Sequence, residues 1–162
     1  MRIKSPQGIL SLDNILPEEP LLMMGAGPVP IPARVAAANG IVINHLGDTM
    51  AQIIEQVKLM TRYVFQTEKG HILGVAGPGS AAMEMAVANL VVPGSKVLSV
   101  SLIGFSNKAW RHIESRTDQL RHWCLDAKLA DQFWYKKAYH YTAPVSGILA
   151  IHEALRLVLQ KP

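Results

Sequence analysis

The chain has 162 residues, of which 49% are hydrophobic and 17% are charged, and its formal net charge is +4. This length is typical of one domain and can bury a sizeable core. The composition excludes an intrinsically disordered chain, because such a chain is rich in charge and poor in large apolar residues.

No apolar run comes near the roughly 20 residues that a membrane span needs. Residues 1–16 include Lys4 and Asp13 and contain no apolar core of a secretory signal. We therefore expect no membrane association and a cytoplasmic location, with an organelle as the alternative. The single cysteine, Cys124, cannot form an internal disulfide, and we expect it to be a buried small apolar group rather than a nucleophile.

The first part of the chain is rich in prolines and glycines. Residues 1–20 are predicted to form an arm, with room for one short turn of helix over 9–15. Residues 21–32 run from apolar residues into glycines and prolines, which indicates a rigid extended loop.

Two helices are predicted next. A short one covers 32–39, with proline at its start and glycine past its end. The clearest helix covers 48–66, where apolar residues recur at helical spacing and Asp48 or Thr49 can act as the cap.

A β–turn–α–turn–β unit follows. The pattern predicts a strand over 71–75, a turn over 76–80, a helix over 81–90 and a second strand over 96–103, and then a further helix over 105–112. Two parallel strands joined by a helix indicate an α/β fold with a right-handed crossover.

Strand signals stop near residue 114. Helices are predicted over 125–134 and from 143 to the C-terminal part of the chain. With only a doubtful third strand at 40–43, the strands are too few for a stable parallel sheet. Either strands escape this reading or the chain lacks part of a larger sheet.

The positive charge is concentrated between residues 108 and 122, around Trp110. Such a stretch can contact a phosphate backbone. It carries no recognition motif for nucleic acid, so we favour a solvated helix face or loop.

The turn within GVAGPGSAAMEMAVANL is the main candidate for a ligand site. Free N–H groups of Gly79, Ser80 and Ala81 at the start of a helix favour a phosphate, although a tight connection without a ligand is the alternative. The P-loop pattern fails, since Ser80 stands where lysine is required. The dinucleotide pattern is met by Gly77, Gly79 and Ala82, but residues 99–107 contain no acidic residue to hold a ribose.

A series of longer stretches can be compared with known families: LLMMGAGPVPIPARV, INHLGD, EQVKLMTRYVFQTEKG, GVAGPGSAAMEMAVANLVVPGSKVL, WCLDAKLADQFW and AYHYTAPVSGILAIHEALRLVL. In this order, and over most of residues 21–160, they resemble the class V (fold type I) pyridoxal-phosphate (PLP) aminotransferases. The resemblance is strongest to the alanine–glyoxylate and serine–glyoxylate (serine–pyruvate) branch.

The resemblance implies roles near the substrate and the cofactor ring. Gly25, Ala26 and Gly27 resemble the loop on the substrate side of the cofactor. Phe105 resembles the aromatic residue that stacks on the pyridine ring, with a plain core position as the alternative.

The resemblance also implies how the cofactor's phosphate is held. Gly79 and Ser80 resemble the phosphate-binding turn, while Pro78 stands where serine or threonine is more usual, which puts one hydrogen bond in doubt. Tyr139 and Thr142 resemble residues that reach across a dimer interface to the partner's phosphate. Loop packing is the alternative for both.

Residues that the family's chemistry needs are missing. The family uses a lysine in Schiff-base linkage, an aspartate against the pyridinium nitrogen and an arginine for the substrate carboxylate. No lysine of this chain has the family's Ser-x-x-Lys context, and the match skips a segment near 112–115. We therefore expect no catalytic residue, no covalent linkage to PLP and no metal site.

The implied organisation has three parts: an arm (1–20), the N-terminal part of the aminotransferase large domain (21–113), and the end of that domain with the interdomain helix (114–162). We predict an α/β fold, part of the PLP-transferase large domain, with parallel strands, flanking helices and an incomplete sheet. We expect the family's small C-terminal domain to be absent.

Two functions fit the sequence. In the first, the chain is a member of the PLP-dependent transaminases, which move an amino group from alanine or serine to glyoxylate or another 2-oxo acid, and is inactive alone. In the second, it is a non-catalytic remnant that binds PLP or phosphate, or pairs with an intact subunit; the family's homodimer makes such pairing plausible. A dinucleotide-binding module is a distant third.

Overall fold

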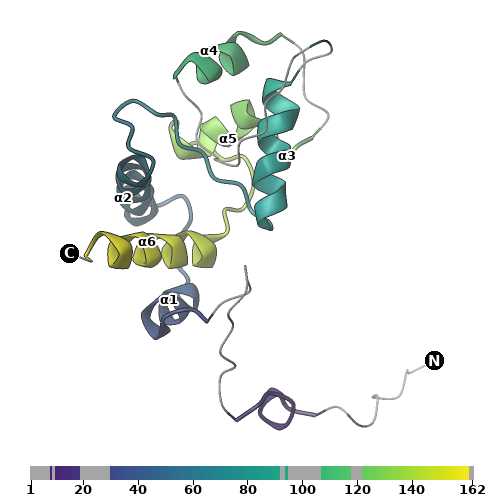
Figure 1. Ribbon diagram of the computed structural model, residues 1–162, viewed down its shortest axis with the longest axis vertical. Helices are drawn as coiled ribbons and strands as arrows, with labels where there is room; N and C mark the ends of the chain where they lie inside the picture. The colour runs from purple at the N-terminus through teal and green to yellow at the C-terminus, as the bar shows by residue number, and fades with distance from the viewer. Residues whose placement is uncertain are drawn as a thin grey trace. The chain divides into compact units, whose positions relative to one another are not determined.

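A computed structural model describes residues 8, 10–18, 30–91, 94, 107–117 and 122–160 (Figure 1). The chain divides into two units, Met1–Pro32 and Ala33–Pro162. In the first unit a 3₁₀ turn, η1, spans Leu12–Asn14, and the described residues from 10 to 18 are exposed. The short helical turn expected over 9–15 is thus confirmed.

The regular elements in the described part of the second unit are helices. They are α1 (Ala33–Asn39), α2 (Asp48–Val64), α3 (Gly79–Leu90), α4 (Asn107–Ser115), α5 (Ala127–Trp134) and α6 (Val145–Leu159). Each corresponds to a helix predicted from the sequence, with boundaries that differ by a few residues. Figure 1 shows α1, α2 and α6 in one group and α3, α4 and α5 in another.

Helix α2 forms because one of its faces is apolar. Met50, Ile54 and Val57 recur at helical spacing and are all buried. The expected cap at Asp48 or Thr49 is wrong: Gly47 is the N-cap, in an extended conformation, and no side chain caps the helix. Asp48 instead lies in the first turn, where its negative charge is favourable to the helix dipole.

The predicted α/β fold is wrong for the described residues, which contain no β-strand. The strand expected over 96–103 lies outside them. Residues 40–43 and 72–75 are irregular, and in the second case the physical reason is visible. Side chains form hydrogen bonds with backbone groups that would pair with a neighbouring strand in a sheet.

Three alternate residues, Gly70, Ile72 and Gly74, form such bonds with side chains. The Gly70 carbonyl accepts from Arg62 Nε at 3.0 Å. The Ile72 N–H donates to the Tyr135 hydroxyl at 2.9 Å. The Gly74 carbonyl accepts from Trp134 Nε1 at 3.1 Å. Successive bonding groups on one edge of an extended chain are two residues apart, so side chains from α2 and α5 replace a strand here.

One hydrophobic cluster contains residues of the helices α2, α3, α4, α5 and α6 and of the loops between them. Its buried members are Met50, Ile54, Val57, Met85, Ile113, Leu125, Ala127, Ala130, Trp134, Ala143 and Ile148. Cys124, expected to be buried, is exposed, so that prediction is wrong. Among the described residues, no helix has the length and apolar character to cross a bilayer.

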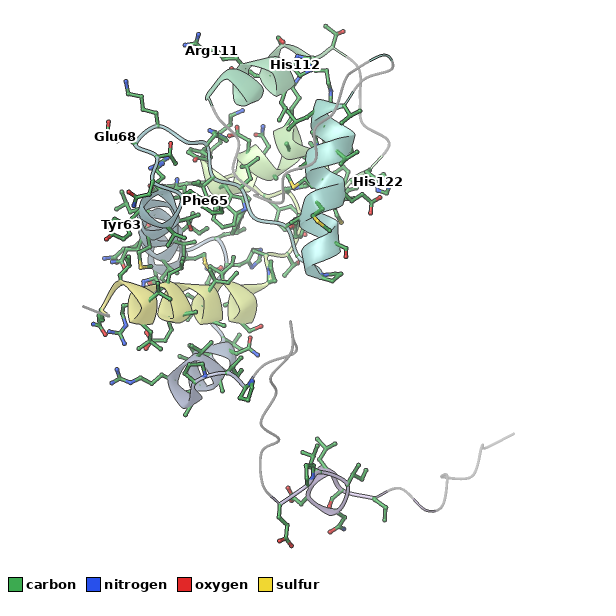
Figure 2. The ribbon with its side chains drawn as sticks, viewed as in Figure 1. Tyr63, Phe65, Glu68, Arg111, His112 and His122 are labelled. Carbon is green, nitrogen blue, oxygen red and sulfur yellow. The ribbon has the colours of Figure 1, made fainter. Side chains whose placement is uncertain are left out.

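Helix α4 lies within the basic stretch noted in the sequence. Its Arg111 and His112 are exposed and labelled in Figure 2, while Ile113 next to them is completely buried. This is the arrangement of a helix with one solvated face. Arg116, just beyond the helix, is used internally: it contacts Asn89 at 3.4 Å and Asp126 at 3.8 Å.

Candidate functional site

The N-terminus of α3 carries the predicted phosphate-binding turn. Gly79 and Ser80 are its first two residues, both exposed, and no side chain caps the helix. The expectation for Ala81 is wrong, because its N–H already donates to the Pro78 carbonyl at 2.8 Å. The N–H groups of Gly79 and Ser80 remain at the open end, where the helix dipole favours an anion.

There is room for a ligand at this end. A Cβ atom placed on Gly79 would meet no atom within 4 Å. Gly77 has a φ of +148°, a backbone conformation that glycine adopts without strain. The chain therefore enters α3 through a glycine turn whose outer side is open.

Within residues 139–142 the two outer side chains are exposed and the two inner ones are buried or half-buried. Tyr139 and Thr142, expected to reach a partner subunit, are exposed, and Tyr139 is 61% exposed. His140 between them is buried and its Nε2 lies 3.0 Å from the Trp123 carbonyl. Since a carbonyl only accepts, Nε2 carries the proton. His140 thus anchors the segment while Tyr139 and Thr142 stay accessible.

Tyr141 links the two parts of the expected cofactor site. Burial raises the pKa of its hydroxyl, and a backbone hydrogen bond with Ala76 acts in the opposite direction. Tyr141 and the Ala76 of the loop before α3 also line the same cavity. The remaining predicted site residues, Gly25, Ala26, Gly27 and Phe105, lie outside the described residues.

A cavity of about 330 Å³ adjoins this loop. It lies among α2, α5 and α6, and its lining includes Ala76, Gly77 and Tyr141. No lysine, arginine, aspartate or glutamate lines it. The lining of this cavity therefore offers no amine for a Schiff base and no carboxylate for a pyridinium nitrogen.

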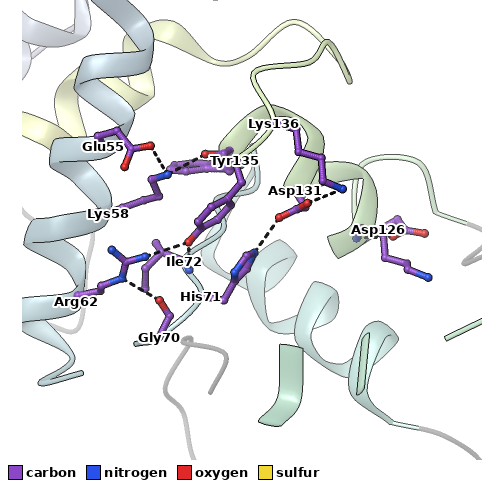
Figure 3. A network of polar contacts seen from close by, with 12 residues as sticks. Glu55, Lys58, Arg62, Gly70, His71, Ile72, Asp126, Asp131, Tyr135 and Lys136 are labelled. Atoms are coloured by element: carbon purple, nitrogen blue, oxygen red, sulfur yellow. Dashed lines mark hydrogen bonds and ion pairs between the residues drawn. The ribbon is translucent and has the colours of Figure 1, made fainter. Parts of the chain in front are cut away.

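Lys58 is the buried lysine of the described chain, and it is engaged. Only 2% exposed, it has its Nζ 2.5 Å from the Glu55 carboxylate and 3.0 Å from the Trp134 carbonyl. The ammonium also lies 4.0 Å from the centre of the Tyr135 ring. Figure 3 shows its side chain directed into a cluster of polar contacts with Glu55 and Tyr135.

Sequence reasoning missed this polar cluster, which joins α2, residues 70–72 and α5 (Figure 3). His71 Nε2 lies 3.0 Å from Asp131, which also pairs with Lys136 at 3.1 Å. One signal was available: Lys58 follows Ile54 by four residues and so falls on the apolar face of α2. Among the described residues, no three His, Cys, Asp or Glu side chains form a group that could bind a metal.

Curated relatives match about half of the chain. Over 78 residues it is 40% identical to alanine–glyoxylate aminotransferase of Oryctolagus cuniculus, covering 48% of this chain and 20% of that protein. The Mus musculus protein of the same name is 42% identical over 79 residues, which cover 48% of this chain and 19% of that protein. An uncharacterized aminotransferase of Methanocaldococcus jannaschii is 33% identical over 88 residues, which cover 54% of this chain and 23% of that protein. The matched stretch thus spans about a fifth of these relatives.

A solved structure extends the likeness to the fold. The crystal structure of alanine–glyoxylate aminotransferase from Nostoc sp. superposes with a TM-score of 0.76 at 20% identity, over 95% of this chain and 73% of that one. No protein-family model matches the chain.

These matches define the class: the chain has distant, partial homology to aminotransferases. Within that class, the matched half of the chain is similar to alanine–glyoxylate aminotransferases, which confirms the resemblance noted in the sequence.

Proposed function

We propose that this chain is a non-catalytic form of a PLP-dependent transaminase that transfers an amino group from alanine or serine to glyoxylate or another 2-oxo acid. By itself it binds PLP without a covalent bond. The observation that carries the proposal is the cavity that adjoins the loop before α3, which no lysine lines. The described lysines with polar partners, Lys58, Lys128 and Lys136, bond to groups elsewhere.

The comparisons support a skipped internal segment. In the Oryctolagus relative 78 residues are 20% of the protein, so 162 residues amount to well under half of such a chain. The structural match nevertheless extends over 73% of the Nostoc chain. A match that wide is expected if the chain joins pieces that lie far apart in its relatives.

The chain's own residues would bind the cofactor through its phosphate. The N–H groups of Gly79 and Ser80 would donate to the phosphate oxygens at the positive end of the α3 dipole. PLP supplies an electron sink for the substrate carbanion when a transaminase holds it. Without a lysine to bind the aldehyde and move the proton, this chain would hold the cofactor but not use it.

Incubation with PLP, borohydride reduction and peptide mass mapping test the covalent part. We expect no stoichiometric adduct on any single lysine and no turnover of alanine with glyoxylate. One fully labelled lysine together with turnover would refute the proposal.

A titration with PLP tests the phosphate site. Ser80→Asp places a negative charge beside the phosphate and should weaken PLP binding at least about tenfold, since like charges repel at short range. Ser146→Asp makes the same change in the first turn of α6 and should leave the affinity unchanged. Equal affinities of the two variants would contradict the assignment.

A second candidate function is pairing with an intact aminotransferase subunit. It is favoured by Tyr139 and Thr142, which are exposed on either side of the anchored His140. Size-exclusion chromatography with a full-length relative should show a mixed complex that the double change Tyr139→Ala and Thr142→Ala abolishes. Tyr63→Ala, at an equally exposed tyrosine on α2, is the control.

A further inference from the structure

The cavity among α2, α5 and α6 has walls that are mostly apolar and aromatic. Trp134 and Phe133 of α5 line it, together with Val57 of α2 and Ile148 of α6. A Cβ on Gly74 would lie 2.3 Å from the Trp134 ring, so the indole is packed directly on this backbone. This contact gives the cavity a rigid wall.

The indole and imidazole groups around the cavity are bonded or buried, while Thr61 adds one hydroxyl to the lining. The Trp134 indole N–H donates to the Gly74 carbonyl, and Nε2 of His140 bonds the Trp123 carbonyl. The other ring nitrogen of His140 is buried, so a molecule in the cavity does not reach it. The half-buried Tyr141 also lines the cavity.

We propose that this cavity binds a small, neutral aromatic molecule. Its volume of about 330 Å³ is in the range of ligand pockets. A site with no charged lining leaves the charge of a phosphate or carboxylate uncompensated, which is costly. An apolar cavity instead gains from taking up an apolar molecule in place of poorly bonded water. The proposal goes beyond PLP binding, which concerns the exposed start of α3.

Isothermal titration calorimetry with two probes tests the class of ligand. Indole is neutral and fits an aromatic cavity, while indole-3-carboxylate has the same rings and a negative charge. Indole should bind at least about tenfold more tightly than its carboxylate, because only the latter loses the hydration of a charge. No binding of indole, or equal binding of both probes, would overturn the proposal.

A cavity-filling variant tests the location. Gly147 of α6 lines the cavity, and a Cβ there would meet only Pro144, at 3.9 Å. Gly147→Leu should therefore place its side chain in the cavity and weaken indole binding at least about tenfold, by occupying the apolar volume. Ser146→Leu, the neighbouring position that does not line the cavity, should leave indole binding unchanged.

A second cavity-filling variant keeps the test valid if Gly147→Leu does not fold. Thr61→Leu adds volume from the opposite wall, on α2. Circular dichroism and a urea titration establish that each variant is folded. If the folded filling variants bind indole as the unchanged chain does, the cavity is not the binding site and the proposal fails, whether or not PLP binds at α3.

Discussion

The rings of His71 and Tyr135 are stacked, with centroids 4.0 Å apart and planes 15° apart. Tyr135 is also the residue to which Lys58 offers its ammonium and Ile72 its N–H. One side chain near the end of α5 thus holds α2 and the irregular segment after it. This arrangement leads to the first two predictions.

Removing the Tyr135 hydroxyl should destabilise the fold. Tyr135→Phe keeps the stacked ring but leaves the Ile72 N–H, in a buried residue, without its acceptor. We expect a loss of about 1–3 kcal/mol in the free energy of unfolding, measured with urea. Tyr63→Phe, at a 65% exposed tyrosine, should stay within about 0.5 kcal/mol. Equal losses in both variants would argue against the bond.

Acid should destabilise the fold through His71. Burial lowers its pKa below 6.5, and the Asp131 carboxylate opposes this, while Arg62 and Lys58 add to it. The unfolded chain therefore binds more protons than the folded chain. The His71 contribution to stability is present above 6.5 and is lost as the pH falls from 6.5 through the lower pKa of the folded state.

The measurement is the urea midpoint across this pH window. His71→Gln should flatten the dependence, because glutamine does not titrate. His122→Gln, at a histidine whose side chain is exposed, should keep it. A midpoint that rises on acidification in the unchanged chain would contradict the assigned direction.

Asn89 should be one of the most sensitive positions. Only 1% exposed, it donates to the carbonyls of Met85 at 2.7 Å and Leu125 at 2.6 Å and accepts from the Ala127 N–H at 3.0 Å. Asn89→Leu removes the side chain that bonds the Leu125 carbonyl, just before α5, and the Ala127 N–H at its start. We expect a loss of at least about 3 kcal/mol, seen as a lower urea midpoint. Asn39→Leu, at an exposed asparagine, is the control and should be close to neutral.

Two glycines should respond to alanine in opposite ways. Gly74→Ala pushes a Cβ into the Trp134 ring and should cost about 1–3 kcal/mol. Gly79→Ala meets no atom within 4 Å and begins α3, so it should be neutral or stabilising by up to about 1 kcal/mol. Thermal unfolding compares them, and equal losses would show that crowding by Trp134 is not the cause.

Much of the helical structure could be read from local patterns. Apolar residues at helical spacing identified α2, because a helix repeats every 3.6 residues and buries one face. The glycine turn indicated where α3 begins, and Ser80 does lie at its open end. These features depend on residues close in the chain.

The segment 71–75 shows where local reading failed. Its short apolar run is typical of a strand, but a strand also needs a neighbour to share its hydrogen bonds. Here Tyr135 and Trp134, about sixty residues away, take those bonds. No periodicity within the run could reveal that.

Residue order was enough to predict the helices and the likeness to part of the aminotransferases, because both depend on patterns along the chain. Three features needed the folded chain: the described residues are helical without a sheet, Lys58 is bonded inside the protein, and a cavity with no Lys, Arg, Asp or Glu in its lining lies among α2, α5 and α6. These depend on which distant side chains meet, and burial sets the energy of each such contact.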